Sequence, residues 1–120
     1  MSTPSIKQCI YEALAAILPN THAVELPERP EWPALVFEIS VDPEPGWVMG
    51  GGYDQNDIAV MTFSRSQEEI EQLTQLVSEA VSALDGFMGD EFSGDADYQG
   101  EADVYAYVQN FRVRTRRKQQ

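Results

Sequence analysis

The sequence is poor in the residues that most active sites and metal centres require. It has one cysteine, Cys9, and one histidine, His22, among 120 residues. A single cysteine excludes an intrachain disulfide and a multi-cysteine zinc site, and a single histidine excludes a metal centre with two or three histidine ligands. We expect Cys9 to act as a small apolar residue of a helix and His22 to have a structural role.

Basic residues are scarce except near the carboxyl end. Only Lys7, Arg29 and Arg65 precede residue 112, so residues 1–111 combine three basic with 20 acidic residues, a net charge of −17. Residues 112–120 carry +5, from Arg112, Arg114, Arg116, Arg117 and Lys118. We expect the acidic body to repel nucleic acid and the basic segment to attract an anion.

Long hydrophobic runs are also absent. No stretch approaches the ~20 apolar residues that a membrane span needs. The first residues, MSTPSIKQCIYEALAAIL, lack both the basic start and the small-residue cleavage site of a secretory signal. We therefore expect a soluble, cytoplasmic protein with no membrane partner.

Two segments have the apolar periodicity of amphipathic helices. Thr3 as N-cap and Pro4 at the first helical position predict a helix over residues 4–18. The capping box Ser66-Gln67-Glu68-Glu69, with Gly86 as the residue after the helix, predicts a second helix over residues 67–85. In the box, Ser66 accepts from the amide of Glu69, and the Glu69 side chain reaches back.

The remaining periodic segments alternate like strands. We expect strands around 22–26, over 34–41 and 57–64, near Phe92 and over 103–115. Both faces of segment 57–64 are largely apolar, as in a central strand. Residues 42–56 form a long loop that joins two paired antiparallel strands.

These elements predict an α+β fold in the order α-β-β-β-α-β-β. The simplest architecture is an antiparallel or mixed sheet of four to five strands with two helices packed on one face. We expect residues 1–111 to form a single domain, because a chain of this length can bury one core. Residues 112–120 are expected to form a flexible, basic carboxy-terminal arm.

No motif argues for catalysis, a cofactor or a metal. Residues 95–100 resemble the opening of a calcium-binding EF-hand loop, but Ala106 stands where that loop needs a bidentate glutamate. The run Gly50 to Gly52 lacks the Gly-Lys-Ser/Thr sequence of a phosphate loop and has acidic neighbours. We therefore expect a protein that is not an enzyme and that holds no metal and no cofactor.

Two features indicate contact with other molecules. Trp47, Val48, Met49 and Tyr53 lie on the glycine-rich loop, and such residues are enriched in interface cores. The equal alternative is that this loop folds back over its own sheet. The basic segment 112–120 is either a disordered tail or an electrostatic arm for the acidic surface of a neighbour or for DNA.

Five blocks of the chain together resemble a known family. They are IYEALAAIL, WPALVFEIS, DIAVMTFS, SQEEIEQLTQLVSEAVSALDGF and DVYAYVQNFRVRT, in that order. Their sequence and spacing resemble the tail terminator and tail-completion (head–tail joining) proteins of long-tailed bacteriophages, including the lambda-type terminator. The likeness runs over nearly the whole chain and lies in core patterns, with no catalytic signature.

The resemblance implies a structural virion protein. Such a protein forms a ring, typically a hexamer, on the end of the finished tail tube, stops tube growth and joins the tail to the head. Its partners would be further copies of itself, the tail tube protein and a head-completion or connector protein, with DNA only in transit through the channel. It would be found in the virion tail, and in the host cytoplasm during assembly.

The resemblance also suggests contact residues. It implies an oligomer or tube interface on the loop between the paired strands, with Trp47, Val48, Met49, Tyr53, Asp54 and Asp57. The basic arm is not part of the family pattern. Two other functions stay open: a monomeric acidic adaptor or inhibitor that binds a basic protein, and an enzyme with a pocket that joins His22 to several carboxylates.

Overall fold

The computed structural model describes residues 5–43, 53–96 and 103–116 of the chain. Its elements are α1 (Ile6–Ile17), β1 (Thr21–Ala23), β2 (Ala34–Pro43), β3 (Tyr53–Ser64), α2 (Gln67–Ser82), β4 (Phe87–Ala96) and β5 (Tyr105–Arg116). The expected α+β class and the order α-β-β-β-α-β-β are confirmed.

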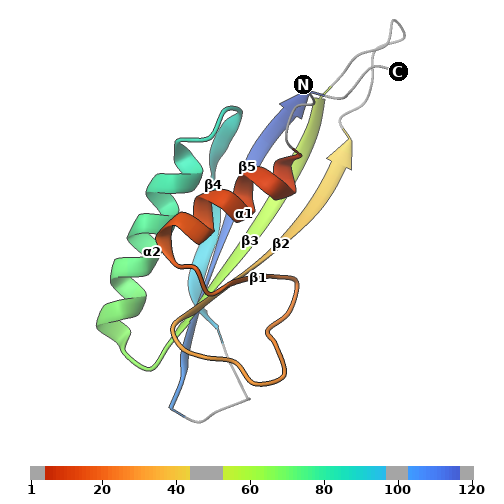
Figure 1. Ribbon diagram of the computed structural model, residues 1–120. Coiled ribbons are helices and arrows are strands. Elements are labelled where there is room, and N and C mark those ends of the chain that lie inside the picture. Colours follow the sequence, from red (N-terminus) through yellow and green to blue (C-terminus); the bar gives the residue numbers. More distant parts are fainter. Residues whose placement is uncertain (1–4, 44–52, 97–102, 117–120) are drawn as a thin grey trace, which may run out of the picture.

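The five strands form one mixed sheet in the order β1-β2-β3-β5-β4. Strand β1 runs parallel to β2, and the other neighbours are antiparallel. Both helices lie on one face of this sheet, as expected (Figure 1). The central position of β3 and its antiparallel pairing with β2 confirm what the apolar faces and the loop predicted.

The main core lies between the helices and the sheet. Alternate residues of the strands face the helices, so Phe37 of β2, Val60 of β3 and Phe111 of β5 are at most 2% exposed. Helix α1 adds Ile10 and Leu14, and α2 adds Val77 and Val81, all fully buried. Burial of these side chains is the dominant favourable term in folding such a domain.

A second, smaller cluster lies on the opposite face of the sheet, which we call the open face because neither α1 nor α2 covers it. Val36, Phe63 and Ala106 are buried there, and Leu26 and Trp32 pack against them. These two residues come from the segment between β1 and β2. That segment therefore covers one end of the open face and leaves the other end exposed.

Helix α1 differs from the prediction at its start. Its N-cap is Ser5, whose hydroxyl accepts a hydrogen bond from the backbone N–H of Gln8, so the helix begins at Ile6 and not at residue 4. Thr3 and Pro4, the predicted start, lie outside the described residues. The hydroxyl that caps the first turn decides the boundary.

Helix α2 begins at Gln67 as predicted, and Ser66 accepts from the backbone N–H of Glu69. The predicted second bond of the capping box, from the Ser66 N–H to the Glu69 side chain, is replaced by two bonds through Ser64. The Ser66 N–H donates to the Ser64 hydroxyl, which donates to the Glu69 carboxylate at 2.6 Å. The helix ends at Ser82, earlier than predicted, and Gly86 (φ +86°) lies in the turn before β4 instead of directly after the helix.

The strands differ in length from the prediction. Strand β3 begins at Tyr53 instead of residue 57 and β2 runs to Pro43, so the predicted loop 42–56 is shorter at both ends. Strands β1 and β4 differ as well. Strand β1 is only Thr21–Ala23, because Val24 adopts a left-handed backbone conformation (φ 72°) and ends it. Strand β4 spans ten residues, whereas a short strand near Phe92 was expected. Register shifts between Phe87 and Gly89 and between Asp90 and Phe92 interrupt its alternation, which hid the strand in the sequence.

Strand β5 runs to Arg116, beyond the predicted start of the arm at residue 112. Residues Arg112 to Arg116 pair with Asp57 to Tyr53 of β3. Residues 112–116 therefore belong to the sheet, as the predicted strand over 103–115 implied for residues 112–115, because Val113 and Thr115 alternate with the arginines and continue the strand period. Arg117 and Lys118 lie outside the described residues.

Candidate interaction surfaces

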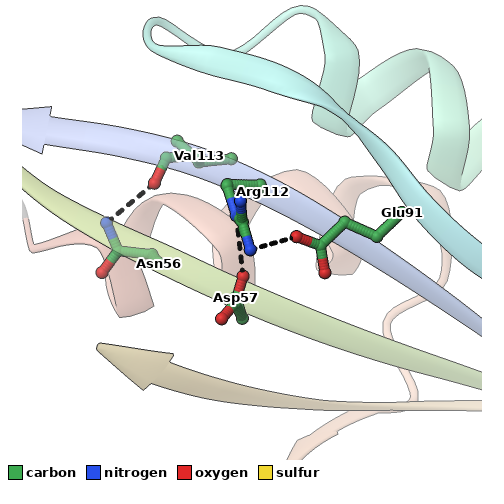
Figure 2. A network of polar contacts seen from close by, with 5 residues as sticks. All are labelled: Asn56, Asp57, Glu91, Arg112 and Val113. Atoms are coloured by element: carbon green, nitrogen blue, oxygen red, sulfur yellow. Dashed lines mark hydrogen bonds and ion pairs between the residues drawn. The ribbon is translucent and has the colours of Figure 1, made fainter. Parts of the chain in front are cut away.

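A polar network occupies the exposed end of the open face. The Arg112 guanidinium on β5 contacts Asp57 Oδ1 of β3 through Nε at 3.1 Å and Glu91 Oε1 of β4 through a terminal nitrogen at 2.5 Å (Figure 2). All three side chains are between about a third and two fifths exposed. One arginine thus links three strands and neutralises two carboxylates that would otherwise repel one another.

On the opposite side of the same strands, a buried amide joins β3 to β5. The Asn56 side chain is 1% exposed, and its nitrogen donates to the Val113 carbonyl at 3.0 Å (Figure 2). The same nitrogen donates to the Thr115 hydroxyl at 2.9 Å. Asn56 and Arg112 therefore hold the end of β5 from both faces. This end of β5 is therefore paired and bonded as part of the sheet.

The outer side of β2 is a free edge beyond Phe37. Strand β1 covers only Leu35 to Phe37: Leu35 N–H donates to Asn20 O, and Phe37 O accepts from Val24 N–H. By strand alternation the backbone groups of Ile39 and Val41 also point outward. They meet no partner strand in the described part of the chain.

The other edge of the sheet, β4, has a different character. Its two register shifts bend the strand, which protects an edge from further pairing. Phe92 is 64% exposed on this strand, and its ring lies near Gly94, where a Cβ atom would stand 3.5 Å away. The β4 edge is irregular, whereas β2 keeps a continuous register over its whole length.

The predicted interface residues fall into two groups. Trp47, Val48 and Met49 lie outside the described residues, so their interface role stays a prediction. Tyr53 and Asp54 belong to strand β3 instead of the predicted loop, and Asp57 lies on the same strand, as the predicted strand 57–64 had it. Asp57, predicted as an interface residue, and Arg112, predicted as an arm residue, meet in one ion pair.

The residues predicted to form the basic arm also fall into a described and an undescribed group. Arg112, Arg114 and Arg116 belong to β5, and Arg114 N–H donates to the Gly86 carbonyl at 2.7 Å. The sequence contained a signal for this arrangement, the alternation Arg-Val-Arg-Thr-Arg over 112–116. Sequence reasoning missed Glu91, because the bulge that brings it beside Arg112 leaves no periodic trace.

The residues considered for chemistry do not converge. His22 lies on β1, and its Nε2 is 2.7 Å from Asn20 Oδ1. Asp95 belongs to β4, and Ala106 is buried in β5 at the position where an EF-hand would need its glutamate. Within the described residues no group of three or more His, Cys, Asp or Glu side chains is placed to hold a metal ion.

In the part of the chain that the structure describes, a hollow between α2, β4 and β5 also lacks a cluster of residues suited to catalysis. It is lined by Gln67, Ile70, Asp95, Ala96, Val104, Tyr105 and Ala106. Among the described residues that line it, Asp95 is the one carboxylate, and His22 is not among them. Among the helices in the described part of the chain, none is long and apolar enough to cross a bilayer.

Comparison with known proteins gives a likeness of fold. No family model matches the chain, and no curated protein matches it. Among solved structures, a chain of "Virion of native gene transfer agent (GTA) particle" superposes with a TM-score of 0.69 at 16% sequence identity. The match covers 93% of this chain and 95% of that chain, so the two share one fold over nearly their full lengths.

Proposed function

We propose that this protein is a structural subunit of a phage-like virion that caps the end of the tail tube, ends tube growth and joins tail to head as a homo-oligomeric ring, typically a hexamer. The observation that carries the proposal is the fold shared with a chain of a gene transfer agent virion over 93% of this chain. The sequence resemblance to tail terminators points the same way.

The geometry is compatible with a role in assembly. The open face has an exposed polar end, and one sheet edge is unpaired beyond Phe37 in the described part of the chain. Such surfaces serve contact between subunits. The partners proposed are further copies of the chain, the tail tube protein and a head-completion or connector protein, with DNA in transit only.

The acidic residues of the chain explain why DNA would pass through the ring without binding to it. Residues 1–111 carry three basic and 20 acidic residues, a net charge of −17. A ring of such subunits repels DNA that passes through it, which prevents adhesion in the channel. The proposed location is the virion tail, with the free subunit in the host cytoplasm during assembly.

Deletion of the gene tests this function. Particles that lack the protein are expected to have overlong tails, or tails without heads, when viewed by electron microscopy. Tails of normal length joined to heads in the deletion strain contradict the proposal. Re-expression of the wild-type chain from a plasmid is the control that attributes any defect to this protein.

The same acidic charge favours one alternative, a monomeric adaptor or inhibitor that binds a basic protein. The two functions differ in their response to concentration and salt. A ring subunit associates with itself as its concentration rises. An adaptor stays a monomer at all concentrations and loses its basic partner steeply as salt increases.

A further inference from the structure

The free edge of β2 exists because the chain turns away from it at Val24. This residue has φ 72°, a conformation that β-branched residues rarely adopt, and its N–H still donates to Phe37 O at 2.8 Å. Without that turn the chain could continue along β2 as a longer β1. Backbone strain of this kind persists only where the surrounding structure holds it, and it clusters at functional sites.

The edge offers both backbone groups and charge. Ile39 and Val41 direct their N–H and C=O groups outward, and Val41 is 56% exposed. Glu38 lies between Phe37 and Ile39 on the same strand. Its side chain is exposed and forms no ion pair in the described part of the chain. An extended, basic segment is the ligand that fits these groups together.

The chain itself contains such a segment next to the end of β5. Residues 117–120 read Arg-Lys-Gln-Gln and follow directly on Arg116, the last residue of the strand. We propose that residues 117–120 of a second copy add to the free edge of β2 as an extended strand, which brings either Arg117 or Lys118 beside Glu38, because neighbouring side chains of a strand point to opposite faces. This inference rests on the proposed ring and names the contact that closes it.

Geometry excludes the same copy as the donor. Arg116 pairs with Tyr53, whereas Glu38 pairs with Ala59, six positions further along β3. Six residues of strand span roughly 20 Å, and two strand spacings add roughly 10 Å across the sheet. Two residues beyond Arg116 extend the backbone by at most about 7 Å, so Lys118 cannot reach Glu38 of its own copy.

The arrangement has a consequence for symmetry. Each copy donates its basic segment at one end and accepts a segment along β2, so the contact is head-to-tail. Head-to-tail contacts generate rings when the rotation between copies closes. Attraction between Lys or Arg and Glu38 also weakens with salt, so assembly is expected to weaken as ionic strength rises.

A charge swap in the full-length chain tests the contact. Glu38→Lys alone, and Arg117→Glu with Lys118→Glu, are each expected to weaken self-association about tenfold in sedimentation velocity. All three substitutions together restore it, because the charges are exchanged. Glu71→Lys on the exposed surface of α2 makes the same change in net charge as Glu38→Lys and is expected to leave association unchanged.

A peptide experiment locates the site even if free subunits do not associate. A peptide of residues 115–120 is titrated to millimolar concentration into the full-length Arg117→Glu, Lys118→Glu chain and followed by NMR. The amide signals of Ile39 and Val41 are expected to shift and their hydrogen exchange to slow, and Glu38→Lys in the acceptor chain abolishes both effects. Absence of shifts at these amides, or shifts centred on another surface, overturns the inference.

Two further outcomes distinguish failure of the β2 contact from failure of the proposed ring function. If the wild-type chain forms rings but the charge swap restores nothing, the β2 contact is wrong and the ring function stands. If the basic segment instead drives binding to double-stranded DNA and its reversal leaves assembly intact, the segment is a nucleic-acid arm and the inference is overturned. Normal tails in the deletion strain contradict the proposed function whatever the peptide does.

Discussion

The two faces of the sheet use the same strands for different purposes. On the helix-covered face, Phe37 and Phe111 are 2% exposed and pack against two helices. On the open face, the apolar cluster ends where the segment with Trp32 stops, and ion pairs around Arg112 take over. Stability therefore resides mainly in the helix-covered face, which leaves the open face and the edges of the sheet available for contacts.

The largest difference in stability is expected between two phenylalanines, one buried under the helices and one exposed on β4. Phe37→Ala is expected to lower the free energy of unfolding by about 3–5 kcal/mol, because it leaves a cavity in the main core. Phe92→Ala, at a side chain that is 64% exposed, is expected to cost less than about 0.5 kcal/mol. Urea denaturation followed by circular dichroism measures both, and equal losses contradict the assignment of the core to the helix side.

A smaller effect is expected where β4 begins. A Cβ atom on Gly86 would stand 2.0 Å from the Arg114 carbonyl oxygen, and the residue has φ +86°. Gly86→Ala is therefore expected to lower the free energy of unfolding by about 1–3 kcal/mol. Gly94→Ala is the matched control, since its Cβ meets only the Phe92 ring at 3.5 Å, and a loss as large as that at Gly86 would show that the clash is not the cause.

The smallest effect concerns the polar end of the open face. A double-mutant cycle with Asp57→Asn and Arg112→Gln is expected to give a coupling energy of about 0.2–1 kcal/mol, because both side chains are roughly two fifths exposed. The coupling should shrink between low and high salt in thermal unfolding. A coupling that is independent of salt would mean that the pair acts through packing and not through charge.

Much of the fold follows from local pattern. The apolar stripes place both helices, and the two apolar faces of β3 place it at the centre of the sheet. Boundaries were harder, because hydroxyls compete for the caps: Ser5 caps α1 in place of Thr3, and Ser64 mediates the back-bond at the start of α2. At α2 the outcome depends on the position of Ser64 at the end of β3, which residue type alone does not reveal.

The candidate surfaces were less accessible to sequence reasoning. Strand β4 is glycine-rich and acidic, and its bulges remove the period that reveals a strand. Glu91 therefore had no visible connection to Arg112, which lies on β5. The strain at Val24, which frees the edge of β2, arises only when the segment after β1 turns to cover the open face.

The most direct measurement of the central claim uses the tail tube itself. Purified tube protein of the same particle is allowed to polymerise with and without this chain, and tube lengths are measured by electron microscopy. The account predicts that the chain forms a ring at one end of each tube and that tubes stop growing. Tubes that continue to lengthen at the same rate in the presence of saturating chain would contradict it.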